Sequence, residues 1–116
     1  MKVNSLKGNT NYDSIFKSKE HQLSSGPFKL LLQKNRSNKL FLGLIVPKKK
    51  IPLATNRNFV KRRAREIVKD KSLKGFNIIF LVTTKIEIFN ESEIKNHIKK
   101  LKRKLESLLS HEKSNQ

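Results

Sequence analysis

One short segment limits the fold more than any other part of this sequence. Phe76 to Val82 reads Phe-Asn-Ile-Ile-Phe-Leu-Val, a nearly unbroken apolar run. Such residues are frequent in strands, and a run without polar alternation is typical of a strand covered on both faces. We therefore expect this segment to form a strand that is buried on both faces, or nearly so.

Three further strands are predicted upstream of this segment. Apolar and polar side chains alternate from Phe28 to Gln33, as in a half-buried strand. A second apolar run ends at Pro47, which has no N–H for a sheet hydrogen bond. The expected strands are His21–Ser24, Phe28–Gln33 and Lys39–Val46, which we interpret as a meander.

Three helices are also predicted, each with a start signal. Asn90 and Glu93 have the spacing of a capping box, and an apolar stripe follows at intervals of four and three residues. The expected helices run from Asn9 or Thr10 to about Lys19, from about Leu53 to Lys69, and onward from Asn90 through Ile94, Ile98, Leu101, Leu105 and Leu108.

The order of these elements, α-β-β-β-α-β-α, places the chain in the α+β class. We expect a two-layer sandwich in which the helices pack on a mixed four-stranded sheet. A chain of 116 residues fits one domain. We place that domain at residues 1–109 and expect residues 110–116 to be a disordered tail.

Several classes of site have no support in the sequence. It contains no cysteine, which excludes disulfides, a thiolate nucleophile and a cysteine-based zinc site. His21, His97 and His111 are scattered, and we interpret them as surface residues rather than catalytic or metal-binding groups. No apolar run approaches the ~20 residues of a membrane span, and the N-terminus lacks a secretory signal. We therefore expect a cytoplasmic protein.

The net charge indicates the kind of partner. Lys and Arg number 27 against 9 for Asp and Glu, which gives a net charge of +18 at pH 7. Self-repulsion on this scale destabilises a compact domain, so it usually persists because the partner is a polyanion. A membrane surface is the competing polyanion, but the basic residues do not oppose an apolar face on one amphipathic helix. Nucleic acid is the better prediction.

The predicted helix from Leu53 to Lys69 concentrates this charge. At about 100° per residue its apolar residues share one side, and its basic residues cover a broad adjacent side. The ordinary alternative is a solvated face, but only Glu66 and Asp70 offset nine basic residues between Lys48 and Lys69. The candidate RNA-binding residues are Lys48, Lys49, Lys50, Arg57, Asn58, Lys61, Arg62 and Arg65.

Two motifs in this region resemble a known family. Gly43 to Ile51 reads Gly-Leu-Ile-Val-Pro-Lys-Lys-Lys-Ile, and Arg57 to Glu66 reads Arg-Asn-x-x-Lys-Arg-x-x-Arg-Glu. They are similar to the strand end and the helix that mark the bacterial ribonuclease P protein component. The resemblance extends from about Leu6 to Leu109. Phe59 stands where the family motif has a second arginine, and Leu31 where the family has an aromatic residue.

This resemblance implies a non-catalytic subunit of an endoribonuclease. The RNA subunit would hold the catalytic Mg²⁺ and hydrolyse the phosphodiester, and the protein would hold no tightly bound cofactor. The protein would bind that RNA subunit and the 5′ leader of precursor tRNA, with no membrane or small-molecule partner. By position, Tyr12, Phe16 and Phe28 would line the leader cleft. Lys49 or Lys50, together with Arg57 and Asn58, would lie at its edge, and Lys61, Arg62 and Arg65 would engage RNA phosphates.

The sequence also has to be weighed against two other classes of protein. A structural ribosomal RNA-binding protein would have a similar size, charge and class of fold. A nuclease that acts alone is disfavoured, because the sequence lacks clustered carboxylates and a histidine-based acid–base pair. From the residues alone, Tyr12 and Phe16 are better explained as core anchors of the first helix than as a nucleic-acid site.

Overall fold

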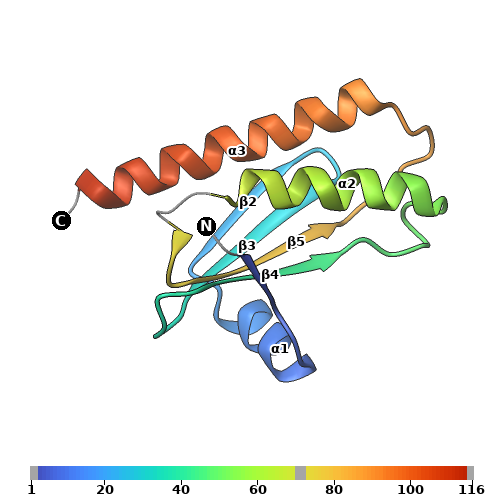
Figure 1. Cartoon of the computed structure of the whole chain (residues 1–116). Coiled ribbons are helices and arrows are strands. Elements are labelled where there is room, and N and C mark those ends of the chain that lie inside the picture. The colour runs from blue at the N-terminus through green and yellow to red at the C-terminus, as the bar shows by residue number, and fades with distance from the viewer. Residues whose placement is uncertain (1–2, 70–72, 115–116) are drawn as a thin grey trace.

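The computed structural model describes residues 3–69 and 73–114 and shows a sheet with helices on both of its faces (Figure 1). In chain order the elements are β1 (Val3–Ser5), α1 (Asn9–Ser18), β2 (His21–Ser25), β3 (Phe28–Lys34), β4 (Leu40–Ile45), α2 (Ala54–Ile67), β5 (Phe76–Val82) and α3 (Glu91–Ser114). None of the helices in these ranges is long and apolar enough to cross a membrane.

The sheet is mixed, as predicted, but its strands are not arranged as a meander. The order is β1-β4-β5-β3-β2, with β4 parallel to β1 and β5, and β3 antiparallel to β2 and β5. The hairpin of β2 and β3 is present, whereas β4 pairs with β5 instead of β3. The meander prediction was wrong because β5, the most deeply buried strand, takes the position between β3 and β4. Parallel pairing of β4 and β5 requires a crossover, and α2 provides it.

The sheet has five strands where four were predicted. The additional strand, β1, pairs in parallel with the outer edge of β4. Asn4 Nδ2 donates a hydrogen bond to the Leu40 carbonyl at 3.2 Å, and the backbone N–H of Leu6 donates to the Leu42 carbonyl at 2.9 Å. With only three residues, β1 is too short to show an alternating pattern in the sequence.

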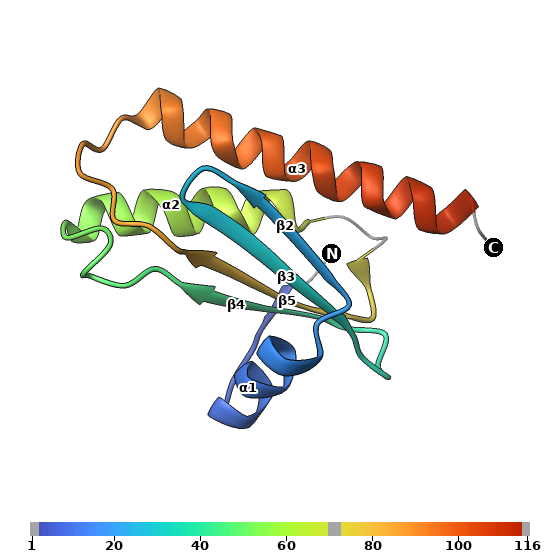
Figure 2. The same ribbon diagram turned by 180° about the vertical axis from the view of Figure 1, so that it is seen from behind.

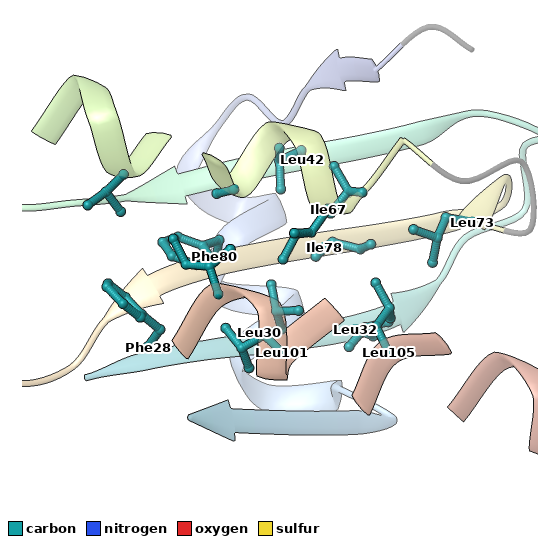
Figure 3. Packing of buried hydrophobic residues seen from close by; sticks show 14 of the residues in the cluster. Phe28, Leu30, Leu32, Leu42, Ile67, Leu73, Ile78, Phe80, Leu101 and Leu105 are labelled. Atoms are coloured by element: carbon teal, nitrogen blue, oxygen red, sulfur yellow. The ribbon is translucent and has the colours of Figure 1, made fainter. Parts of the chain in front are cut away.

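The helices divide the sheet into two differently covered faces. α2 and α3 lie side by side on one face, and α1 crosses the other (Figures 1 and 2). The larger core joins β3 and β5 to α2 and α3, as Figure 3 shows. Its fully or nearly fully buried members include Leu30, Leu32, Ile67, Ile78, Phe80, Leu101 and Leu105.

Phe28 belongs to this core and not to a cleft, which corrects the position predicted from the family resemblance. Its side chain is fully buried, and its ring centroid lies 5.3 Å from that of Phe80 in a stacked arrangement. Side chains alternate along a strand, so Phe28 and Leu30 face α3, while Leu31 faces α1. The strand was correctly predicted, but its cleft-facing side was not.

The N-terminal cap of α1 and the C-terminal end of α3 differ from the prediction. Gly8, at φ +89°, is the N-cap residue of α1, so the predicted caps Asn9 and Thr10 are the first two residues of the helix itself. At the start of α3, Asn90 Oδ1 accepts a hydrogen bond from the Glu93 N–H at 3.1 Å, as the capping pattern predicts. α3 then continues to Ser114, beyond the point where we expected a disordered tail; residues 115–116 lie outside the described part.

Two contacts hold α1 against its face of the sheet. Ile15 is fully buried in a small cluster with Leu31 and Ile79. Tyr12 lies directly over Gly43, where a Cβ would fall 2.5 Å from Tyr12 Oη and 2.7 Å from its Cε1. The absence of a side chain at Gly43 therefore sets how closely the aromatic ring approaches β4.

This contact predicts the effect of Gly43→Ala. The added methyl group overlaps the Tyr12 ring, so we expect the free energy of unfolding to fall by about 1–3 kcal/mol, measured by urea titration. The matched control is the same change in a Tyr12→Ala background, where the space is vacant and the cost should be much smaller. Equal costs in both backgrounds would show that Tyr12 does not occupy this position.

Candidate nucleic-acid interface

Two aromatic side chains of α1 open onto a groove beside β4. Tyr12 and Phe16 are one helical turn apart, so they lie on the same side of α1. Phe16 is 40% exposed, and Tyr12 is half-buried against the sheet. The groove, which we call the α1 cleft, has a volume of about 450 Å³ and is lined by Tyr12, Phe16, Leu44, Ile45, Val46, Pro47 and Lys61.

The basic helix meets this cleft from the other side. Val60 and Ala64 are fully buried against the sheet, which fixes the rotation of α2 about its axis. Lys61 follows Val60 and reaches the α1 cleft, and it also lines a neighbouring pocket of about 260 Å³ together with Arg65, Tyr12 and β1. The structure thus brings Tyr12, Phe16, Lys61 and Arg65 together, from segments that are distant in the sequence.

The other predicted contact residues lie near this site but do not line it. Arg62 and Asn58 are exposed on α2, and Lys48 and Lys49 are exposed in the turn after Pro47. Lys50, the third lysine of the run, is half-buried, and its carbonyl accepts a hydrogen bond from the Ile86 N–H at 3.0 Å. The three lysines and Arg62 extend the basic surface away from the cleft.

Arg57 has a local structural role as well. Its Nη1 donates to the carbonyls of Ile51 and Pro52 at 3.0 and 2.7 Å. These bonds hold the half-buried guanidinium against the segment that leads into α2. Arg57 therefore fastens the beginning of the basic helix, which the motif alone does not reveal.

The basic surface is not neutralised by nearby carboxylates. In the described part of the chain, an ion pair at the C-terminal end of α2 joins Lys69 Nζ, just beyond the helix, to Glu66 Oε1 at 3.1 Å, with both side chains more than half exposed. Within the same described residues, Lys61, Arg62 and Arg65 have no carboxylate partner. The segment from Ala54 to Ile67 is helical throughout, so these cations are held at regular spacing.

Sequence reasoning missed the apolar wall of the cleft. Leu44, Ile45, Val46 and Pro47 were assigned only to a strand end, although they are four of the seven residues that line the cleft. The signal available was Gly43, because a glycine inside an apolar strand often marks a close approach by another group. No group of three or more His, Asp or Glu side chains among the described residues is arranged to hold a metal ion.

Comparison with known proteins places this arrangement in a family. The family model described as Ribonuclease P matches residues 1–106. The ribonuclease P protein component of Alcanivorax borkumensis is 32% identical over 96 residues, which cover 81% of this chain and 79% of that protein. The corresponding protein of a Marinomonas species is 32% identical over 91 residues, covering 77% and 69% of the two chains.

Solved structures show the same fold. The RNase P protein of Staphylococcus aureus superposes with a TM-score of 0.70 at 24% identity, covering 86% of this chain and 93% of that one. The RNase P protein of Thermotoga maritima gives a TM-score of 0.62 at 30% identity, covering 86% and 96%. With the family match over residues 1–106, these likenesses show that the chain belongs to the ribonuclease P protein component family.

Proposed function

We propose that this chain is the non-catalytic protein subunit of the ribonuclease P ribonucleoprotein. In this role α2 binds the RNA subunit, and the α1 cleft takes the 5′ leader of precursor tRNA. The RNA subunit, with its Mg²⁺, hydrolyses the bond that releases the leader. The protein acts in the cytoplasm with these RNA partners. The observation that carries the proposal is the cleft shared by Tyr12, Phe16 and Lys61.

The composition of the α1 cleft suits a single strand of RNA. Aromatic rings stack on any base, because every base has a π-face, and a neighbouring cation attracts the backbone. Phe16 supplies an exposed ring, Tyr12 a second ring one turn away, and Lys61 the cation. Apolar side chains of β4 close the groove and offer no base-specific hydrogen bonds. We therefore expect leader binding that tolerates many sequences.

The exposed side of α2 suits the phosphate backbone of folded RNA. Arg62 and Arg65 are exposed and have no carboxylate partner among the described residues. A guanidinium group binds phosphate through two parallel hydrogen bonds, and a helix keeps such groups at fixed spacing. Binding of this kind releases counterions, so it weakens steeply as salt concentration rises.

Reconstitution tests the proposed function directly. The purified protein alone should cleave no precursor tRNA. With the cognate RNA subunit, at moderate ionic strength and with Mg²⁺, it should increase the rate of leader removal over that of the RNA alone. A protein that leaves this rate unchanged, and that instead co-sediments stoichiometrically with ribosomes, would indicate a structural ribosomal protein.

Paired substitutions test the assignment of the two surfaces. Arg62→Ala and Arg65→Ala should each weaken binding of the RNA subunit and lower the slope of log affinity against log salt by about one. Phe16→Ala should instead weaken binding of precursor tRNA to the holoenzyme more than binding of mature tRNA, because only the precursor has a leader.

The control for Phe16→Ala is Ile88→Ala, which removes an apolar side chain that is 84% exposed and outside the α1 cleft. This variant should bind both tRNAs as the parent protein does. Equal losses of precursor and mature tRNA binding in Phe16→Ala would remove Phe16 from the leader site. Unchanged salt slopes in both arginine variants would show that Arg62 and Arg65 do not contact the RNA subunit.

A further inference from the structure

A second basic groove lies on the other flank of α2, away from the α1 cleft. It runs between α2 and α3, which pack side by side on the same face of the sheet (Figure 1). Ile67 of α2 and Ile98 of α3 are buried and form its apolar floor. Its cationic rim consists of Arg63, Lys95, Lys99 and Lys102. We call it the α2–α3 groove; its volume is about 170 Å³.

The spacing of the lysines places them along the same border of α3. Lys95, Lys99 and Lys102 are separated by four and three residues, so they succeed one another on one side of the helix. Arg63 faces them from α2. The groove therefore presents a row of ammonium groups on one wall and a guanidinium on the other.

Phe59 holds two of these cations close together. The Arg63 guanidinium lies 5.4 Å from the centroid of the Phe59 ring, and Lys95 Nζ lies 5.9 Å from the same centroid. Phe89 packs edge-on against that ring at 5.9 Å, which fixes its orientation. Cations within about 6 Å of a ring face are attracted to it. Phe59, which replaces an arginine of the family motif, thus brings together positive charges from two helices.

The groove has no internal counter-charge that balances this cluster. Glu66 is the acidic residue of the lining, and its carboxylate is bonded to Lys69 Nζ at 3.1 Å. Among the described side chains, none of the four rim cations forms an ion pair with a carboxylate. Like charges held together repel one another, and an external polyanion relieves that repulsion.

We propose that the α2–α3 groove binds a second stretch of sugar–phosphate backbone of the RNA subunit. This inference rests on the proposed function. The precursor leader is assigned to the α1 cleft, which lies beyond the other flank of α2. Lys61, Arg62 and Arg63 are consecutive and sweep about 200° of the circumference of α2, so positive charge continues from the RNA-binding side into the groove. Lysine ammonium groups act as point charges, so the contact positions the RNA without reading its sequence.

A charge-matched pair of triple variants tests this groove in the full-length protein. Lys95→Gln/Lys99→Gln/Lys102→Gln removes three positive charges from the rim. The control, Lys34→Gln/Lys39→Gln/Lys74→Gln, removes the same charge from exposed lysines at strand ends outside both grooves. We expect the groove triple to weaken binding of the RNA subunit and to lower its salt slope by about three. The control triple should change the slope much less, and both should unfold at the parent temperature.

The outcomes separate this inference from the proposed function. Equal salt slopes for the two triple variants would mean that the groove lysines act only through the overall positive charge of the protein. That result would overturn the inference. An effect of the groove triple on a leader oligonucleotide, but not on the RNA subunit, would overturn the assigned partner. If Arg62→Ala and Arg65→Ala weaken binding while the groove triple does not, the inference alone fails. If the parent protein does not bind the RNA subunit, the proposed function fails.

A positional probe provides a second measurement that does not depend on charge removal. Because the chain has no cysteine, Asn96→Cys on the exposed surface of α3 accepts a single tethered hydroxyl-radical source. In the complex it should cut one confined stretch of the RNA subunit. The same probe on Asn38→Cys, in the connection between β3 and β4, should not cut that stretch. Absence of cutting from Asn96→Cys would overturn the inference.

Discussion

Burial of β5 on both faces is the constraint on which the rest of the molecule depends. Ile78 and Phe80 are fully buried beneath α2 and α3, and Ile79 is fully buried on the face crossed by α1. A strand of this kind needs a partner at each edge and helices over each face, because its apolar area would otherwise contact water. β3 and β4 supply the edges, and α2 reaches its face because it connects two parallel strands.

This core also sets the direction of the functional side chains. Burial of Val60 and Ala64 leaves α2 only one rotation about its axis, and that rotation turns Lys61 toward the α1 cleft and Arg63 toward α3. Burial of Ile15 does the same for α1 and turns Phe16 outward. The sites contain few buried polar groups of their own. Their geometry is therefore a product of apolar packing, and their binding free energy would come from exposed rings and cations.

The sequence predicted the helices, four of the strands and the basic side of α2, because each depends on local periodicity. It did not predict the strand order, since the pairing of β4 with β5 joins segments separated by a whole helix. The same limit explains Phe28. Alternation shows that Phe28 and Leu31 face opposite sides of β3, but not which side α1 will cover.

The candidate site was partly predictable for the same reason. Tyr12 and Phe16 share a helix side, and the family motif identifies Lys61 and Arg65. Their meeting at the α1 cleft and at the pocket beside it depends on tertiary packing. The hydrogen bonds of Arg57 to two carbonyls and the contact of Phe59 with Arg63 and Lys95 likewise have no local signal, because each joins groups whose proximity is set by the fold.

The short strand β1 has a consequence for solubility. It occupies the outer edge of β4, a strand that reads Leu-Phe-Leu-Gly-Leu-Ile and carries no charge. An uncovered edge of that composition would offer free backbone groups and apolar side chains to another copy of the chain, the usual starting point for intermolecular sheet growth. The three residues of β1 thus shield an uncharged, apolar strand edge, and their loss would favour self-association even where the core stays intact.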